Sequence, residues 1–391
     1  MRFRNPFISA VLKATRTATR RTTRAMQKNA MKATATALQN AFKHGWPVDG
    51  LANRPKKRGP AASSKTAAGT GDAQAAMDRP ASARQADGDH ADVGAHVLEQ
   101  VQAGQFVSRS LGNAAGTRAY KLYIPKTYTG QPMPLLVMLH GCTQDPDDFA
   151  AGTRMNRIAE EAGCFVAYPA QSKKANGHKC WNWFSAIDQQ RDSGEASIIA
   201  DITRTVIEAY GCDRRRIFVA GLSAGGAMAV IMGNRYPELY TAVGVHSGLP
   251  YAAARDLSSA MAAMRRGAVD LEIDRAHGAD AGGKPLPIIV FHGDIDKTVH
   301  PRNGEQIIEQ ALAHIASTER KEQGAIVSDG VPQYTRAIYE DGEQRPMAEL
   351  WTVHGTAHAW SGGSSEGSYT AAGGPDASAE MMRFFTTAGM Q

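Results

Sequence analysis

The sequence predicts an α/β fold in which a mostly parallel β-sheet is covered by helices on both faces. Short, continuous apolar runs such as 134–140 and 164–169 are typical of strands that are buried on both faces. They alternate with longer segments of 3.6-residue apolar period, such as 197–211. In addition, a strand pattern over 216–223 runs through a glycine-flanked serine into a helical pattern over 224–236.

The elements are expected as two leading strands, followed by buried strands that alternate with helices. The expected strands cover residues 105–110, 119–125, 134–140, 164–169, 216–223, 241–247, 286–293 and 348–355. The expected helices cover residues 153–163, 197–211, 224–236, 304–315 and 376–385. The first helix should end at Gly163, a residue type that favours helix C-termini. Residues 250–285 have no strand pattern, which predicts an insertion over one end of the sheet.

The composition fits a globular protein and excludes several other classes. Of the 391 residues, 42% are hydrophobic and 21% are charged, which excludes a collagen and a wholly disordered chain. Four cysteines are too few for a disulfide-built scaffold. No run of about 18 apolar residues occurs, so no transmembrane segment is expected.

Positive charge is concentrated at the start of the chain. Residues 1–60 hold 14 lysines and arginines and one acidic residue, whereas residues 61–391 hold 30 basic and 37 acidic residues. The net charge of +6 therefore comes from the N-terminal region, the remainder of the chain is mildly acidic, and we expect no nucleic-acid partner.

Three regions are predicted along the chain. Residues 1–45 form either a basic amphipathic helix, which would bind an anionic or polymer-granule surface, or a solvated tail. Residues 46–95 are rich in Pro, Gly, Ala and Ser and indicate a disordered linker. Residues 96–391 form the α/β domain that carries the chemistry, with order beginning near Val97.

A G-x-S-x-G match at Gly221–Gly225 marks Ser223 as the candidate nucleophile. The match follows an expected strand and opens an expected helix, so the serine would lie in a strained turn with its hydroxyl exposed at the sheet edge. The glycines are expected because a side chain would clash with the neighbouring backbone. A second match, Gly363–Gly367, has no strand before it, which argues against Ser365.

A serine nucleophile needs a histidine base and an acid that orients the histidine. In this type of sheet the chain order is serine, acid, histidine. Asp296 lies in the loop after the expected strand 286–293, whereas Asp294, which is nearer the strand, should brace the turn. His358 lies one short loop after the last expected strand and is the predicted base.

The other histidines are expected to have structural roles. His300 is too close to the acid loop, His354 ends a strand, and His246 and His292 precede the required position. A metal pair of His354 and His358 is disfavoured because Gly355 argues against a helix there and no HExxH pattern or cysteine cluster accompanies them.

Attack of a serine on a carbonyl carbon forms a tetrahedral intermediate with a negatively charged oxygen. Such catalysis therefore also needs two backbone N–H groups that bind this oxyanion. One is expected from Ala224, directly after the nucleophile at the start of a helix. The other is expected from the loop after strand 134–140, where Cys142 is the first choice and Gly141 or Thr143 are the alternatives.

Five sequence strings resemble the poly(3-hydroxybutyrate) depolymerase-type esterases, which are α/β-hydrolases similar to feruloyl and acetylxylan esterases. The strings are LHGCTQDPDDFAAGTRMN, CWNWF, GLSAGGAMA, HGDIDKTV and HAWSGG, and the resemblance covers about residues 105–388. It implies an α/β-hydrolase fold with a strand-turn-helix nucleophile elbow, the triad Ser223, Asp296 and His358, and Cys142 in the oxyanion loop. It implies no metal or organic cofactor.

The resemblance also implies an activity and a class of substrate. The expected activity is that of a serine carboxylic-ester hydrolase, which cleaves hydroxyalkanoate oligomers or polymers, or short-chain esters, through an acyl-enzyme. A feruloyl or acetylxylan esterase is the alternative. Secreted, polymer-degrading members carry a signal peptide and a C-terminal polymer-binding domain, and neither is visible in this sequence. Short esters or oligomers are therefore expected rather than crystalline polymer.

Two further expectations concern the surroundings of the site, and a third concerns location. Trp181 and Trp360 lie in loops beside the site, either as substrate contacts or as ordinary packing. Cys142 and Cys180 lie in two of the strings that carry the resemblance, and are either bridged by a disulfide or free thiols.

The resemblance favours an extracellular protein, and the lack of a visible secretory signal leaves an intracellular, granule-associated protein as the alternative.

Overall fold

The computed structural model describes residues 104–388 with the exception of 270–285, 314, 316–317, 324–326 and 329–330. The predicted tail and linker, and the expected start of order near Val97, lie outside these residues. No helix within the described ranges is long and apolar enough to cross a membrane.

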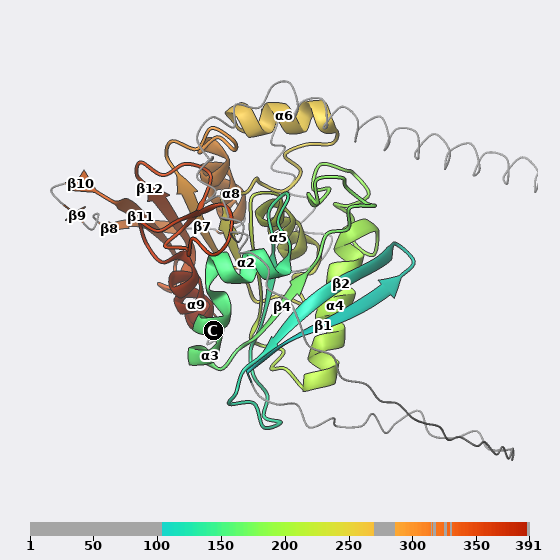
Figure 1. The fold of residues 1–391 in the computed structure, drawn as a ribbon. Helices are drawn as coiled ribbons and strands as arrows, with labels where there is room; N and C mark the ends of the chain where they lie inside the picture. Colours follow the sequence, from blue (N-terminus) through green and yellow to red (C-terminus); the bar gives the residue numbers. More distant parts are fainter. Residues whose placement is uncertain are drawn as a thin grey trace, which may run out of the picture. The chain divides into compact units, whose positions relative to one another are not determined.

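The described strands form a ten-stranded sheet in the order β1-β2-β4-β3-β5-β6-β7-β12-β11-β8. Its six central strands, β4 to β12 in this order, are parallel, and antiparallel strands extend both ends (Figure 1). The strands are β1 (Gln105–Asn113), β2 (Gly116–Ile124), β3 (Leu135–Leu139), β4 (Phe165–Pro169), β5 (Ile217–Leu222), β6 (Ala242–His246), β7 (Ile288–Gly293), β8 (Thr318–Gln323), β11 (Tyr334–Asp341) and β12 (Pro346–Val353). The predicted mostly parallel sheet is confirmed, and the antiparallel strands at its two ends make it a mixed sheet.

Four short strands form two small separate sheets. β9 (Val327–Ser328) pairs with β10 (Val331–Pro332), and β13 (Trp360–Ser361) pairs with β14 (Thr370–Ala371).

Helices cover both faces of the sheet. They are α2 (Pro146–Thr153), α3 (Met155–Ala162), α4 (Gly194–Tyr210), α5 (Ala224–Arg235), α6 (Leu257–Arg266), α8 (Arg302–Leu312) and α9 (Ala377–Ala388). Side chains of successive residues in a strand point to opposite faces of the sheet, so two neighbouring residues of β6 identify the helix that covers each face. A Cβ on Gly233 of α5 would meet Val243, whereas a Cβ on Gly244 would meet Phe385 of α9.

The core is built from the apolar strands that the sequence indicated. Every residue of β3, β4, β5, β6 and β7 is buried, as expected for strands covered on both faces. Phe385 of α9 stacks on Phe218 of β5, with ring centroids 4.8 Å apart. Helix α3 ends as predicted at Gly163, whose φ of 60° is left-handed and whose N–H bonds back to the carbonyls of Ala159 and Glu160.

Several elements were not expected from the sequence. Helix α2 has only eight residues, and it begins after Asp145, whose side chain accepts a hydrogen bond from the Asp148 N–H. Strands β8 and β11 extend the sheet beyond β12, but β11 is mostly only half-buried and therefore lacks a continuous apolar run. The expected insertion at 250–285 contains helix α6, and its second half lies outside the described residues.

The close approach of α9 to β6 gives a prediction about stability. A Cβ at Gly244 would lie 2.9 Å from Ala220 Cβ, Met381 Sδ and Phe385 Cζ, so Gly244→Ala should overpack the core. We expect a loss of about 1–3 kcal/mol in the free energy of unfolding, measured by urea denaturation. Gly177→Ala is the matched control, because a Cβ there would meet no atom within 4 Å. Equal stability of the two variants would contradict this packing.

Candidate active site

The loops that carry the candidate residues leave the same edge of the sheet. Strands β3, β5, β7 and β12 are parallel, so their carboxyl ends share one edge. The loop after β3 carries Cys142, and the turn after β5 carries Ser223. The loop after β7 carries Asp296, and the loop after β12 carries His358. The topology thus gathers residues that are up to 216 positions apart in the sequence.

Ser223 lies in a strained turn between β5 and α5. Its φ of 57° and ψ of −119° are rare for a residue with a side chain, and such strain is typical of functional sites. A Cβ at Gly225 would lie 2.0 Å from the carbonyl oxygen of Leu139, and one at Gly221 would lie 2.4 Å from the backbone of Gly225. The turn is therefore pressed against the end of β3, and only glycine fits at both positions.

Asp296 and His358 form a short, buried hydrogen bond. His358 Nδ1 lies 2.6 Å from Asp296 Oδ2, and the carboxylate's other oxygen accepts from the N–H groups of Thr298 and Val299 at 2.8 and 2.9 Å. Burial opposes the charge of Asp296, but hydrogen bonds from His292 and His358 hold the pKa of this carboxyl well below its usual value. Asp296 is therefore an anion that orients the His358 ring.

His292 is a second histidine beside this carboxylate. Its Nε2 lies 3.5 Å from Asp296 Oδ2 and donates to the carbonyl oxygen of Val299 at 2.8 Å. The sequence indicated only an interior role for His292, because nothing in its string shows that its ring turns towards the acid loop. The Asp296 carboxylate is thus held by one histidine from β7, the strand before its loop, and by one from the loop after β12.

The remaining candidates near the acid have the structural roles that were expected. Asp294 accepts from the Gly355 N–H at 2.8 Å and lies 3.0 Å from His354 Nδ1, so it braces the turn after β12. The second G-x-S-x-G serine, Ser365, is exposed in a loop. His246 is buried, and its Nε2 accepts from the Ser361 N–H at 3.0 Å.

The loop after β3, residues 140–143, contains the three candidate N–H groups of Gly141, Cys142 and Thr143. The Gly141 N–H donates to Gln144 Oε1 at 2.9 Å, and the Thr143 N–H donates to the carbonyl oxygen of His178 at 2.6 Å. The Cys142 N–H has no hydrogen-bond acceptor among the described residues. Ala224 begins helix α5, where the first N–H groups have no intrahelical acceptor. Among the N–H groups of Gly141, Cys142 and Thr143, only that of Cys142 has no acceptor within the described residues and is available to a ligand.

A disulfide joins Cys142 to Cys180, with the two Cα atoms 4.2 Å apart. The bridged alternative is thus the one that the structure contains, whereas Cys164 and Cys212 are buried, free thiols. The bridge ties the loop after β3 to the segment that precedes α4.

The expectation that Trp181 and Trp360 contact a substrate is not supported by the structure. Their side chains are 0% and 1% exposed. Trp181 Nε1 donates to the carbonyl oxygen of His140, and Trp360 Nε1 donates to Ser378 Oγ, each at 3.1 Å. Both rings are therefore core residues, and each indole N–H is satisfied by an acceptor within the protein.

A metal-binding site is also not found in the described part of the chain. No group of three or more His, Cys, Asp or Glu side chains that could hold an ion occurs there.

Comparisons with known proteins agree on one family. The sequence model of the family described as "Esterase PHB depolymerase" matches residues 118–325. Poly(3-hydroxyalkanoate) depolymerase C of Paucimonas lemoignei is 31% identical over 230 residues, which are 58% of this chain and 54% of that protein. A probable acetylxylan esterase A of Aspergillus fumigatus is 27% identical over 231 residues, 56% of this chain and 61% of that protein. The chain thus spans little more than half the length of these relatives.

A solved structure shows the same fold. The acetyl xylan esterase from Aspergillus awamori matches with a TM-score of 0.54 and 19% identity, over 72% of this chain and 99% of that one. At this identity the likeness concerns the fold alone, and it confirms the predicted α/β-hydrolase class.

The buried histidines give a prediction about pH. Burial lowers the pKa of His246 to about 3, whereas a histidine in an unfolded chain titrates near about 6.5. Between these values the unfolded chain takes up a proton that the folded state does not, so His246 costs stability as the pH falls from about 6.5 towards 3. We expect His246→Gln to reduce the slope of unfolding free energy against pH by about 1.4 kcal/mol per pH unit between pH 6 and 4.5. Urea denaturation at several pH values measures this slope, and an unchanged slope would contradict the burial of a neutral ring.

Proposed function

The chain belongs to the esterase PHB depolymerase family, and on this premise we propose that it is a serine carboxylic-ester hydrolase. Ser223 is the nucleophile, His358 the general base and acid, and Asp296 the residue that orients His358. The observation that carries the proposal is the 2.6 Å hydrogen bond between His358 Nδ1 and the buried Asp296 carboxylate, at the sheet edge where the Ser223 turn also ends.

The Asp296 contact determines which nitrogen of His358 does the chemistry. An Asp296 anion holds the proton on Nδ1, so Nε2 carries the lone pair that accepts a proton. Ser223 Oγ attacks the ester carbonyl carbon while its proton passes to His358 Nε2. The tetrahedral intermediate then expels the alcohol, which takes the proton from Nε2, and the acyl group remains on Ser223. Water repeats the sequence, and its proton passes through His358 to regenerate the Ser223 hydroxyl as the acid leaves.

The oxyanion of each tetrahedral intermediate would bind the N–H groups of Cys142 and Ala224. Both N–H groups lie beside the Ser223 turn, one in the loop after β3 and one at the start of α5. The pairing of the Gly141 and Thr143 N–H groups supports Cys142 over its two neighbours. Loss of one such donor typically reduces turnover by about 10²–10³-fold.

The substrate we favour is a hydroxyalkanoate ester, as a short oligomer or as a polymer chain. This rests on the family and on the 31% identity to poly(3-hydroxyalkanoate) depolymerase C. The second candidate is an acetylated or feruloylated polysaccharide, because relatives named acetylxylan and feruloyl esterases are 26–28% identical over similar lengths. In either case the basic residues 1–45 would either attach the protein to an anionic or granule surface or form a solvated tail, the two alternatives that the sequence leaves open.

The assignment of the nucleophile predicts the outcome of a paired substitution. Ser223→Ala should abolish hydrolysis of p-nitrophenyl butyrate and of 3-hydroxybutyrate oligomers, because the acyl-enzyme can no longer form. Ser365→Ala is the matched control, since Ser365 belongs to the second G-x-S-x-G string and lies exposed in a loop. Release of p-nitrophenol and of free 3-hydroxybutyrate measures the two activities. Cleavage of p-nitrophenyl, feruloyl or acetyl esters without cleavage of the oligomers would favour the second substrate class.

The two aspartates of the acid loop predict a further contrast. Asp296→Asn should reduce kcat by about 10³–10⁴-fold, because the neutral amide no longer fixes the reactive tautomer of His358. Asp294→Asn should retain most of the activity, because the hydrogen bonds of the Asp294 carboxylate within the described residues go to His354 and Gly355 in the turn after β12. Steady-state kinetics on p-nitrophenyl butyrate compare them, and the reverse order of effects would reassign the acid.

A further inference from the structure

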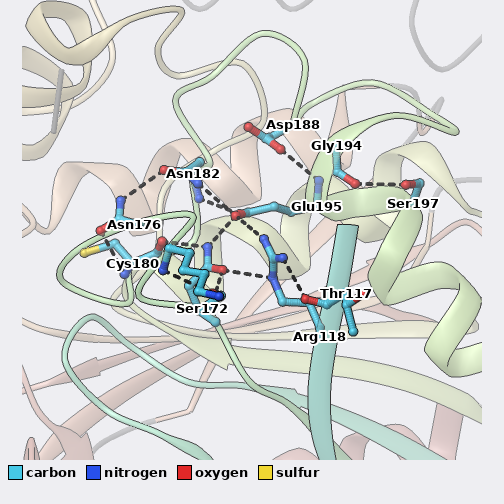
Figure 2. Close-up of polar contacts among 12 residues, drawn as sticks. Thr117, Arg118, Ser172, Asn176, Cys180, Asn182, Asp188, Gly194, Glu195 and Ser197 are labelled. Atoms are coloured by element: carbon cyan, nitrogen blue, oxygen red, sulfur yellow. Dashed lines mark hydrogen bonds and ion pairs between the residues drawn. The ribbon is translucent and has the colours of Figure 1, made fainter. Parts of the chain in front are cut away.

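Glu195, the second residue of helix α4, is a buried carboxylate that the mechanism above does not use. Its side chain is 4% exposed and accepts hydrogen bonds from four donor groups of three residues (Figure 2). Arg118 of β2 donates to its Oε1 at 3.1 Å, and Gln171 Nε2 donates to the same oxygen. The backbone N–H and the side-chain amide of Asn182 each donate to the carboxylate at 2.8 Å.

The backbone of Glu195 is held by a residue that precedes helix α4. Asp188 accepts from the Glu195 N–H at 2.8 Å and lies against Gly194, which has a positive φ and no room for a side chain. Figure 2 shows Glu195 between Arg118 on one side and Asn182 on the other, with Asp188 above it. Burial, together with the charge of Asp188, raises the pKa of Glu195 to about 7, while the donors that face it favour its anion.

Three of these donors, from Gln171 and Asn182, belong to residues 171–182, which we call the bracing segment. This segment holds the loop of residues 140–143 at four points. Gln171 N–H donates to His140 Nε2 at 3.0 Å, and Trp181 Nε1 donates to the His140 carbonyl at 3.1 Å. The Thr143 N–H donates to the carbonyl of His178 at 2.6 Å, and the disulfide joins Cys142 to Cys180. The position of the Cys142 N–H therefore depends on the position of the bracing segment.

Internal bonds alone do not fix the bracing segment on the sheet. Its Gln171 links the two ends by donating to the Cys180 carbonyl at 2.9 Å, and Asn176 donates to Asn182 at 3.0 Å. Glu195 connects these same two ends, at Gln171 and Asn182, to β2 and α4. A buried ion pair is weak evidence for stability, because the cost of desolvation offsets its attraction. The directional set of four donors instead points to a role in positioning.

We propose that Glu195 is a positioning residue for the oxyanion hole, which it acts on through the bracing segment and the Cys142–Cys180 disulfide. This inference rests on the proposed function, because it requires the Cys142 N–H to bind the oxyanion. Loss of the Glu195 contacts would let the bracing segment shift, and the Cys142 N–H would shift with it. Misplacement of a catalytic group by about 1 Å can cost up to about 10²-fold in rate. The effect would fall on kcat, since the oxyanion forms only after the substrate has bound.

The test is a mutant cycle on p-nitrophenyl butyrate, with the disulfide intact in all chains that have both cysteines. Glu195→Gln, the paired change Cys142→Ser with Cys180→Ser, and the combination of all three are compared with the wild type. If Glu195 acts through the disulfide, Glu195→Gln and the paired cysteine change should each lower kcat by about 10-fold. The variant that combines all three substitutions should then have a kcat only slightly below that of the more impaired of these two variants. The Michaelis constant should stay within about twofold of the wild type throughout. Independent effects that multiply to about 100-fold would overturn the inference.

Glu349→Gln is the matched control for loss of a buried carboxylate. Glu349 of β12 is 1% exposed and accepts from Arg336, Arg383 and Trp351, yet none of these belongs to the bracing segment. We expect this variant to unfold at lower urea concentration but to keep kcat within about twofold. A loss of kcat equal to that of Glu195→Gln would mean that Glu195 has only a structural role.

A second variant covers the case in which Glu195→Gln does not fold. Asn182→Ala removes one donor of the bracing segment and leaves the pair of Glu195 with Arg118 in place. It should lower kcat several-fold without changing the Michaelis constant, and an unchanged kcat would overturn the inference. Labelling of wild-type Ser223 by diethyl p-nitrophenyl phosphate separates this failure from that of the proposed function. A wild type that is neither labelled nor active refutes the esterase itself, whereas a labelled, active wild type with fully active variants refutes only the role of Glu195.

Discussion

The structure of the site depends on a contact between backbones that leaves no room for a side chain. The turn after β5 lies against the end of β3 so closely that a Cβ at Gly225 would be 2.0 Å from the Leu139 carbonyl oxygen. This contact brings the Ser223 turn, the first N–H of α5 and the loop at Cys142 to one place. The positive φ of Ser223 is a consequence, since the chain must reverse sharply to enter α5 from that position. The other parts of the site are arranged around this fixed point.

The electrostatics of the site follow from how each charged or polar group is buried. Asp296 keeps its charge because two histidines and two N–H groups face its oxygens. His140, whose pKa burial lowers to about 4, stays neutral and so accepts the hydrogen bond of the Gln171 N–H. In the proposed mechanism the Asp296 anion holds the proton on His358 Nδ1 and so leaves Nε2 free to accept one.

Much of this arrangement could be predicted from the sequence, because it depends on order along the chain. Continuous apolar runs identify the parallel strands, and the order serine, acid, histidine places Ser223, Asp296 and His358 in the loops where the structure has them. The half-buried strand β11 could not be found in this way, because it has no apolar run. Contacts between residues far apart in the sequence could not be predicted from local patterns either. They determine the interior position of Trp181, the approach of His292 to Asp296 and the four donors around Glu195.

The contact between β7 and the loop that carries His358 limits which positions around the site can change during evolution. A Cβ at Gly293 would lie 2.1 Å from the Thr356 carbonyl oxygen, so the loop that carries His358 rests directly on the strand that presents Asp296. Every single-nucleotide missense change of a glycine codon adds a side chain. Any such change at Gly293 would therefore create a clash with the backbone at Thr356. Inherited variation in substrate preference would therefore accumulate in exposed segments around the site, while the spacing between acid and histidine is passed on unchanged.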